Sequence, residues 1–401
     1  MATTSLSRHG LRELNREQVL RTILREGPLA RVDLAHQTGL TTAAITNITR
    51  ELIEDGLLRE VGTARGKRVG ASAILLDLPE EGPLLGAVHQ GVSALRLALC
   101  TLRGRLLARR VIRTPGPSSP EATVGLIVQI LQDLLIEAGY ASTALLAVGA
   151  GVVGLVDGAR GLVKRAPSLG WEGVPLGDLL AARLQCPVAI ENNVRAMALG
   201  EALLGQGRHW PDFAFVYIGT GIGSGLMING HPYRGAHGSA GEIGHITVDP
   251  AGERCACGNR GCLETIAAEP AILRQARARG LTLESSTAGP KEAVRQLARL
   301  ALDGHPLARE VVQRCGESLG IALATLTDIL NPSRIVLHGA ITVAGAIFFS
   351  AVAECLHQRA FLTRDASVEL VAPTFGEDAG LVGAASLALD RLVLGASARE
   401  H

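Results

Sequence analysis

The chain has 401 residues and a mass of 41.8 kDa, a length that predicts two or three domains at ~150 residues each. Apolar residues make up 47% of the sequence and charged residues 19%, which excludes a long disordered protein. The net charge of +1 excludes a polycation that coats nucleic acid, but it allows a small DNA-binding domain on a neutral body.

We expect a cytoplasmic protein with no membrane insertion. Residues 1–12 contain no apolar segment of the kind found in secretory signals. One uncharged run, Ile335–Ala353, reaches membrane length, but glycine and polar residues interrupt it. Its pattern predicts a buried strand, Ile335–Leu337, followed by a glycine turn and an apolar helix.

The first 78 residues have the pattern of a helix-turn-helix. Apolar residues at helical spacing predict helices at Leu14–Glu26, Arg31–Thr38 and Thr42–Asp55, the first two ending at glycines. Thr41 is a suitable N-cap for the third helix. Small polar residues let such a helix enter a DNA major groove. The outer side of this helix carries Thr42, Ala43, Thr46, Asn47, Thr49 and Arg50.

Two short strands, Leu57–Val61 and Ile74–Leu78, are predicted next, with the basic loop Gly62–Gly70 between them. A loop of this kind is a wing that reaches phosphates or a minor groove. The alternative is a three-helix protein-interaction module, which the wing disfavours. The residues expected to contact double-stranded DNA are Thr41, Thr42, Ala43, Thr46, Asn47 and Arg50 on the helix, and Arg65, Lys67 and Arg68 in the wing.

From Pro83 onward, glycine-separated strands alternate with helices. Leu84–Val88 and Leu95–Cys100 form one strand–turn–strand unit, and Phe213–Ile218 and Gly225–Ile228 form a second. Because each unit is followed by α/β segments, we predict a duplicated α/β domain with a cleft between its halves.

The strongest local signal is a cluster of one histidine and three cysteines. Their imidazole and thiolates complete the tetrahedral shell of Zn²⁺ and leave no open position, so we predict one structural zinc ion per chain. Zinc binding folds small modules of this kind with ~10–16 kcal/mol. The alternative is three unpaired surface thiols beside an unrelated histidine. The predicted ligands are His245, Cys255, Cys257 and Cys262.

Glycine occupies every second position of Gly219–Gly225. The backbone N–H groups of such a loop can hold phosphate, but a strand follows it, which excludes the dinucleotide-binding pattern. The alternative is a glycine-rich hairpin without a ligand. The candidate phosphate-binding residues are Gly219, Thr220, Gly221 and Gly223.

Carboxylates and amides cluster in the sequence around the metal-binding loop. Glu242 and Glu264 flank that loop, and Asn192 and Asn193 follow the predicted strand Val188–Ile190. Such groups exchange hydrogen bonds with neighbouring hydroxyls. The alternative is that the two glutamates are solvated surface charges.

Together these motifs resemble the repressor branch of the ROK family (repressor, open reading frame, kinase) over nearly the whole chain. The helix-turn-helix of the family is matched by Gly27–Arg31, Leu34-Ala35, Thr38–Leu40 and Glu51–Leu57. Its sugar-kinase core is matched by Gly219–Gly225, Arg234–His245, Cys255–Glu264 and Asn331-Pro332.

The resemblance implies a winged helix-turn-helix at residues 1–78 and a two-lobed, actin-like α/β sugar-kinase domain at 79–401. The small lobe would span about 79–194 with 382–401, and the large lobe about 195–381. It also implies that His245 binds zinc through one ring nitrogen and can contact sugar through the other. The implied sugar-binding residues are Asn192, Asn193, Glu242, His245 and Glu264.

Two departures from the kinases of this family argue against phosphoryl transfer. Those kinases carry an aspartate general base where this chain has Asn193, and loss of such a base costs ~10²–10⁴ in rate. Their first phosphate loop, Asp-x-Gly-Gly-Thr, is replaced by His89–Ser93, which removes the carboxylate that organises Mg²⁺.

The sequence therefore predicts a sugar-responsive repressor of carbohydrate-metabolism genes with a catalytically inactive kinase-like domain. A homodimer or a dimer of dimers would place recognition helices in successive major grooves of an imperfect palindrome. The effector would be a sugar or sugar phosphate. The alternatives are an ATP-dependent sugar kinase with an accessory DNA-binding domain, and a ligandless domain controlled by a protein partner.

Overall fold

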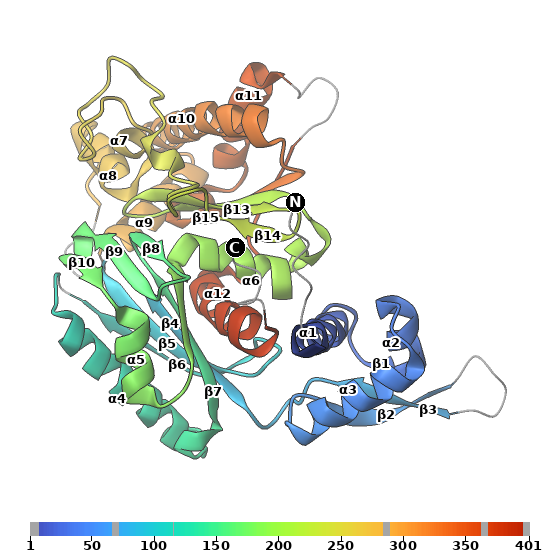
Figure 1. The fold of residues 1–401 in the computed structure, drawn as a ribbon. Coiled ribbons are helices and arrows are strands. Elements are labelled where there is room, and N and C mark those ends of the chain that lie inside the picture. The colour runs from blue at the N-terminus through green and yellow to red at the C-terminus, as the bar shows by residue number, and fades with distance from the viewer. Residues whose placement is uncertain (1–7, 66–71, 115, 284–288, 362–367, 396–401) are drawn as a thin grey trace. The chain divides into compact units, whose positions relative to one another are not determined.

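The computed structural model describes residues 8–65, 72–114, 116–283, 289–361 and 368–395 (Figure 1). Its contacts divide the chain into two compact units. The first comprises Met1–Arg208 and Asp378–His401, and the second comprises His209–Glu377.

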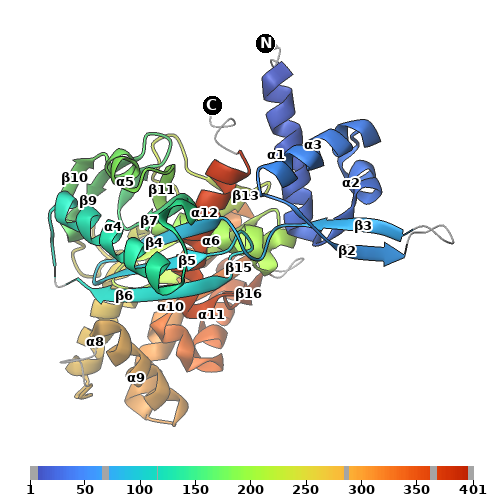
Figure 2. The same ribbon diagram turned by 90° about the horizontal axis from the view of Figure 1, so that it is seen from below.

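The N-terminal segment of the first unit is a winged helix-turn-helix, as predicted. A three-stranded antiparallel sheet in the order β1-β3-β2 accompanies its three helices (Figure 2). The strand β1 is only two residues long, too short to show any alternation in the sequence. The elements are α1 (Arg8–Glu26), β1 (Leu29–Ala30), α2 (Arg31–Thr38), α3 (Thr42–Glu54), β2 (Arg59–Arg65) and β3 (Ser72–Asp77).

Local sequence explains where these helices begin and end. The Thr41 hydroxyl caps α3 by accepting a hydrogen bond from the Ala44 amide at 3.2 Å, as predicted. α2 ends at Gly39, whose φ of 69° is a left-handed conformation that favours glycine. Ile45 and Leu52 are buried on the inner face of α3.

Two details of the prediction are wrong. Strand β2 begins at Arg59 and continues to Arg65, so the first half of the predicted wing loop is paired strand. Thr49 is buried, and its hydroxyl is satisfied there: it donates to the Ile45 carbonyl at 2.8 Å and accepts from Arg31 Nε at 3.1 Å. Lys67 and Arg68 lie outside the described residues.

The rest of the first unit is built on a five-stranded sheet in the order β11-β7-β4-β5-β6. Strands β4, β5 and β6 form an antiparallel meander, whereas β7 pairs parallel with β4 and β11 pairs parallel with β7. A second, antiparallel sheet contains β8, β9 and β10. The strands are β4 (Leu84–Gln90), β5 (Ala94–Cys100), β6 (Leu106–Arg113), β7 (Leu145–Val152), β8 (Leu155–Asp157), β9 (Leu162–Ala166), β10 (Trp171–Val174) and β11 (Val188–Asn192); the helices are α4 (Pro120–Glu137), α5 (Leu176–Leu184), α6 (Asn193–Leu204) and α12 (Ala379–Ala388).

Alternation along the strands divides the core of this unit in two. Leu97 and Leu99 of β5 pack in the cluster that contains α4, whereas Ala98 and Cys100 pack in the cluster that contains α12. This second cluster also contains Ile23 of α1 and the other core residues of the helix-turn-helix. The DNA-binding segment is therefore joined to this lobe by a continuous apolar core.

The second unit repeats the same topology, which confirms the predicted duplication. Its sheet has the order β14-β13-β12-β15-β16, with an antiparallel meander followed by two parallel strands. Strand β13 begins at Ile222, three residues before the predicted start. The strands are β12 (Phe213–Ile218), β13 (Ile222–Ile228), β14 (His231–Tyr233), β15 (Arg334–Gly339) and β16 (Glu369–Val371); the helices are α7 (Glu264–Ala267), α8 (Glu269–Ala278), α9 (Pro290–Leu302), α10 (Pro306–Leu330) and α11 (Ala346–Arg359).

The uncharged run of membrane length is a buried strand and a helix, as predicted. It comprises β15, a short 3₁₀ segment at Ala340–Ala344 and most of α11. Across the described part of the chain, no helix is both long and apolar enough to span a bilayer.

A tight contact between β7 and α12 gives a test of this packing. A Cβ at Gly149 would lie 1.8 Å from the Ala384 carbonyl oxygen, so Gly149→Ala must displace α12. We expect a loss of ~1–3 kcal/mol or more, measured by urea unfolding. Gly125→Ala, in α4 with no atom within 4 Å of the added Cβ, is the control and should stabilise by ~0.5–1 kcal/mol. Equal destabilisation by both variants would contradict the described packing.

Candidate functional site

The predicted metal ligands come together in the second unit. One donor atom from each of His245, Cys255, Cys257 and Cys262 lies within 4.8 Å of all the others. The Cys255 sulfur lies 3.7 Å from His245 Nδ1, and the Cys257 and Cys262 sulfurs are 3.7 Å apart. Three thiols and an imidazole at this spacing fit a tetrahedral Zn²⁺ ion.

Backbone contacts hold the metal-binding loop in a compact shape. The Cys255 amide donates to the Asn259 carbonyl at 2.8 Å, and Thr247 bridges to Cys262. A Cβ at Gly261 would lie 1.6 Å from the Asp249 carbonyl oxygen, which requires glycine there. The chain can therefore bring His245 into one cluster with three cysteines that follow it by ten residues or more, without a disulfide.

The surroundings of the thiols shift their pKa values in different directions. Burial, together with the neighbouring thiols of Cys257 and Cys255, raises the pKa of Cys262 to about 12. A hydrogen bond from the Asn259 backbone lowers the pKa of Cys257. A positive charge placed among these sulfurs, such as a metal ion, would favour the thiolate form of Cys262.

Nδ1 of His245 is the ring nitrogen nearer to the cluster, because it contacts Cys255. If Nδ1 binds the metal, Nε2 remains for another partner, and His245 is exposed. Glu242 is also exposed and precedes the 3₁₀ turn Ile243–His245, whose last amide donates to the Glu242 carbonyl at 3.1 Å.

Glu264 connects the metal-binding loop to the glycine-rich loop. One of its carboxylate oxygens accepts a hydrogen bond from the Ile222 amide at 3.1 Å. A Cβ at Gly221 would lie 2.8 Å from that oxygen, and a Cβ at Gly219 would lie 2.5 Å from the Tyr217 ring. These contacts account for two of the glycines without phosphate, so phosphate binding at Gly219, Thr220, Gly221 and Gly223 stays a prediction.

The predicted sugar-binding asparagines lie in the first unit, at the start of α6. Asn192 is the N-cap: Oδ1 accepts from the amides of Val194 at 2.9 Å and Arg195 at 3.2 Å, and Nδ2 donates to the Gly154 carbonyl at 3.0 Å. Asn193 is the first helical residue, and its Oδ1 accepts from the Val194 amide at 3.0 Å. Most of the Asn192 amide is thus committed to the fold, whereas Asn193 keeps more of its hydrogen-bonding capacity.

Sequence reasoning missed the buried ion cluster next to these asparagines. Glu191 binds Arg195 at 2.9 Å and Arg391 at 2.8 Å, and all three side chains are at most 6% exposed. Glu191 Oε1 also accepts a hydrogen bond from the backbone amide of Asn192 at 2.8 Å. The Arg195 spacing of four residues on α6 is visible in the sequence, but the partner Arg391 lies 200 residues away.

The predicted DNA-contacting residues of α3 share an exposed face. Arg50 is 3.9 Å from Glu54, an exposed pair that contributes ~0–1 kcal/mol and can open for a phosphate. Arg16 on α1 binds Glu51 and Asp55 at the end of α3, which fixes the orientation of this helix. The exposed residues are Thr41, Thr42, Ala43, Thr46, Asn47 and Arg50.

Profiles of known families match both parts of the chain. A family described as the ROK family matches residues 85–391, and a family described as winged helix-turn-helix DNA-binding matches residues 12–59.

Two relatives in bacteria are similar over most of their length. The chain is 29% identical over 394 residues to a putative xylose repressor of Caldicellulosiruptor sp. (strain Rt8B.4), which covers 96% of this chain and 97% of that protein. It is 31% identical over 358 residues to the DNA-binding transcriptional dual regulator NagC of Escherichia coli (strain K12). The alignment covers 87% of this chain and 86% of that protein.

Two crystal structures show the same fold. One is a ROK family transcriptional regulator, a homologue of the E. coli Mlc protein, with a TM-score of 0.82, 29% identity, and coverage of 97% of this chain and 98% of that one. The other is a ROK family glucokinase from Streptomyces griseus in complex with glucose and AMPPNP, with a TM-score of 0.64, 28% identity, and coverage of 76% and 98%.

The metal cluster predicts a specific effect of Cys257→Ser. Loss of one thiolate should release the metal and unfold the loop, because structural zinc supplies folding free energy. We expect about one zinc ion per chain in the purified protein by elemental analysis and almost none in the variant. Cys186→Ser, a half-buried cysteine outside the cluster, is the control. A variant with normal stability, and no metal in either protein, would contradict the zinc assignment.

A second prediction concerns Glu269, whose amide donates to the Gly219 carbonyl at 2.8 Å. Burial raises the pKa of Glu269 from 4.5 to about 7, although Lys291 and Arg295 lower it. Its Oε1 atom has no hydrogen-bond partner among the described residues. The folded protein therefore holds this proton more tightly than the unfolded chain does.

Stability should consequently fall as the pH rises from about 4.5 to about 7. Glu269→Gln should remove roughly 2–3 kcal/mol of this pH dependence, measured by urea unfolding at pH 5 and pH 8. Exposed Glu137→Gln is the control and should leave the dependence unchanged. The idea fails if Glu269→Gln and the wild type lose the same stability between the two pH values.

Proposed function

This chain belongs to the ROK family, and we propose that it is a cytoplasmic, sugar-responsive repressor of carbohydrate-metabolism genes whose kinase-like domain senses sugar without phosphorylating it. The observation that carries the proposal is the continuous apolar core between the helix-turn-helix and the lobe that holds Asn192 and Asn193. A DNA-binding segment packed in this way moves with that lobe. A relative that covers 96% of this chain is named a putative xylose repressor, which supports the same function.

The DNA partner is an imperfect palindrome bound by a homodimer or a dimer of dimers. The exposed face of α3 offers small side chains for close approach, with Asn47 and Arg50 long enough to reach base edges or phosphates. Two copies related by a two-fold axis would place their α3 helices in successive major grooves. The wing would add contacts from Arg65, Lys67 and Arg68.

The effector is a sugar or a sugar phosphate. Its hydroxyls would bind Asn192 and Asn193 of the first unit, and Glu242, His245 and Glu264 of the second. For sugar to control DNA binding, it must bind two conformers of the protein with unequal affinity, since tight binding alone shifts no equilibrium. The structural zinc ion would hold the loop that presents His245 and Glu264.

Two features support the absence of phosphoryl transfer. Asn193 can orient a hydroxyl but cannot accept its proton. At the end of β4, the kinase carboxylate is replaced by His89, which is buried against Gly380, where a Cβ would lie 2.5 Å from the His89 ring. The neighbouring Gln90 is buried as well, and its amide donates to the Gly91 carbonyl at 2.9 Å. Neither side chain can organise Mg²⁺ as a carboxylate does.

The experiment measures binding to an operator selected from random duplex DNA, in the presence and absence of D-xylose, N-acetylglucosamine and glucose. We expect sequence-specific binding whose affinity changes with one of these sugars. Arg50→Ala should weaken binding by about tenfold or more, because it removes a contact worth ~1–3 kcal/mol. Arg110→Ala removes the same charge from a half-buried position on β6, where it pairs with Glu137, and is the control.

An active sugar kinase is the second candidate, because a glucokinase shares the fold of the body. A coupled assay with ATP, Mg²⁺ and the same sugars separates the two functions. We expect no turnover above the background of an Asn193→Ala variant. Turnover at ordinary kinase rates, or a purified protein that shows no preference for any DNA sequence, would overturn the proposal.

A further inference from the structure

Two adjacent residues near the C-terminus hold different parts of the first unit. α12 is followed directly by η8, a single π-helical turn at Leu389–Val393. Asp390 of this turn binds α1 of the DNA-binding segment, and Arg391 binds the ion cluster at the start of α6. Such turns are rare, and they are frequent at functional sites.

The Arg391 side of the turn is buried and fully engaged. One guanidinium nitrogen donates to the carbonyls of Gly158 and Ile190, each at 3.1 Å, and the other binds Glu191 Oε2 at 2.8 Å. The other carboxylate oxygen of Glu191 accepts a hydrogen bond from the backbone amide of Asn192. Arg391 therefore responds to any movement of the strand end that carries the proposed sugar-binding asparagines.

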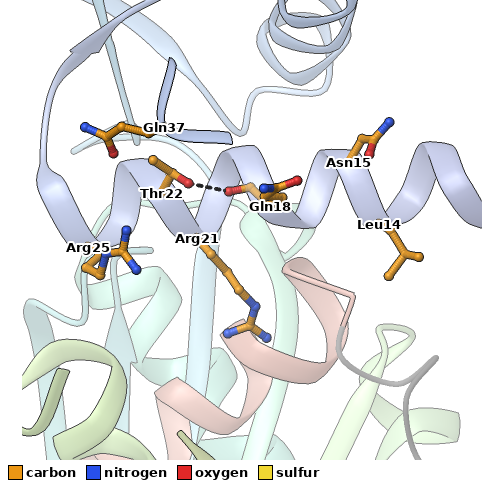
Figure 3. Close-up of a pocket in the computed structure, with 7 residues that line it drawn as sticks. All are labelled: Leu14, Asn15, Gln18, Arg21, Thr22, Arg25 and Gln37. Carbon is orange, nitrogen blue, oxygen red and sulfur yellow. Dashed lines mark hydrogen bonds between the residues drawn. The ribbon is translucent and has the colours of Figure 1, made fainter. Parts of the chain in front are cut away.

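The Asp390 side of the turn reaches the DNA-binding segment. Asp390 accepts a hydrogen bond from Arg21 Nη2 at 2.6 Å, and Arg21 Nε donates to Glu17 at 2.7 Å. Figure 3 shows Arg21 extending from α1 toward the C-terminal helical segment, on the side of the helix away from Gln37. Arg21 also borders a hollow of about 490 Å³ that runs along α1.

The charged side chains of this contact are largely buried. Glu17 is 2% exposed, and Asp390 is 13% exposed. Burial lowers the pKa of Arg21, but attraction to Asp390 and Glu17 outweighs it, and the pKa is raised above its usual value. Leaving Glu17 or Asp390 without its partner is unfavourable, which favours arrangements that keep these pairs together.

We infer that η8 is a coupling element between the sugar-binding lobe and the DNA-binding helices. Arg391 ties η8 to Glu191, and Asp390 ties it to Arg21. A shift of the strand end at Asn192 is then passed to α1, and from α1 to the recognition helix through Arg16 and Glu51. Asp390 and Arg21 are positioning residues, because they contact neither the sugar nor the DNA in the proposed function. The inference rests on that proposed function.

The first experiment removes the contact between Asp390 and Arg21 and measures sugar dependence. Asp390→Asn, Arg21→Gln and the double variant are compared by the ratio of operator dissociation constants with and without saturating sugar. We expect each single variant to bring this ratio about threefold or more closer to one, the value that means no effect of sugar. The reason is that the contact contributes to the coupling free energy between the two sites. The double variant should show no further loss, because both changes remove one interaction.

Sugar affinity by calorimetry and operator affinity without sugar should stay within about twofold of the wild type, since a merely structural defect would change them too. Arg25→Gln is the control, because Arg25 is an exposed residue of α1 that pairs only with its neighbour Glu26 among the contacts described for it. A ratio unchanged in Asp390→Asn and Arg21→Gln would overturn the inference.

The second experiment needs no sugar and separates the inference from the proposed function. Hydrogen–deuterium exchange of the α1 amides in Glu191→Gln is compared with exchange in the wild type. Arg391→Lys, which keeps the positive charge, is the second variant and serves if Glu191→Gln folds poorly. We expect faster exchange in α1, although Glu191 does not contact this helix in any interaction described above. Unchanged exchange in α1 would overturn the coupling. A wild type whose operator affinity ignores all three sugars and their phosphates would instead overturn the proposed function and leave the exchange result to decide the coupling.

Discussion

One apolar core holds the DNA-binding segment and the first lobe of the body together, and the function proposed for the chain depends on it. The core includes Ile23 of α1, Leu76 of β3 and Ala384 of α12, which come from three distant parts of the sequence. An exposed bend at residues 80–83 joins β3 to β4, but the apolar core beside it is continuous, and this packing restrains the helix-turn-helix against the lobe. A change in the lobe must therefore be transmitted to the recognition helices as a movement of packed elements, which have few alternative arrangements.

The polar contacts add direction to this apolar packing. An apolar core alone tolerates small rotations of one element on another, since dispersion contacts are not directional. The hydrogen bonds of Arg391 with Glu191 and of Asp390 with Arg21 have fixed geometry and therefore select one position of η8 against β11 and α1. The apolar core supplies most of the affinity between the segments, and the charged pairs specify their arrangement.

The sequence predicted the local features of the fold well, because they depend on neighbouring residues. The boundaries of α2, the Thr41 cap and the grouping of His245 with the three cysteines follow from spacing and capping chemistry, and the structure has them as expected. The duplicated strand–turn–strand units were also recognisable, since glycines mark each turn.

The errors and omissions arise where distant residues decide the outcome. Thr49 fits the outer face of α3 by helical spacing, yet it is buried and accepts a hydrogen bond from Arg31, which is 18 residues away. The β2 strand extends past its predicted end because β3, a later segment, pairs with it. Glu191 and Arg391 are ordinary charged residues in the sequence, and only the return of the chain through α12 brings them together. No local pattern contains this information.

In the proposed function, the amide at position 193 suits a sensor rather than a damaged enzyme. A protein that phosphorylated its own effector would consume the sugar that it senses. The occupancy of the site would then depend on turnover as well as on sugar concentration. Asparagine keeps a donor and an acceptor for a sugar hydroxyl and gives up only the basicity. The helix that begins at Asn193 remains capped by Asn192 in the same way with either residue, since the cap uses the Asn192 oxygen. Catalysis can thus be lost at this position while the geometry of binding, and its connection to Glu191, is retained.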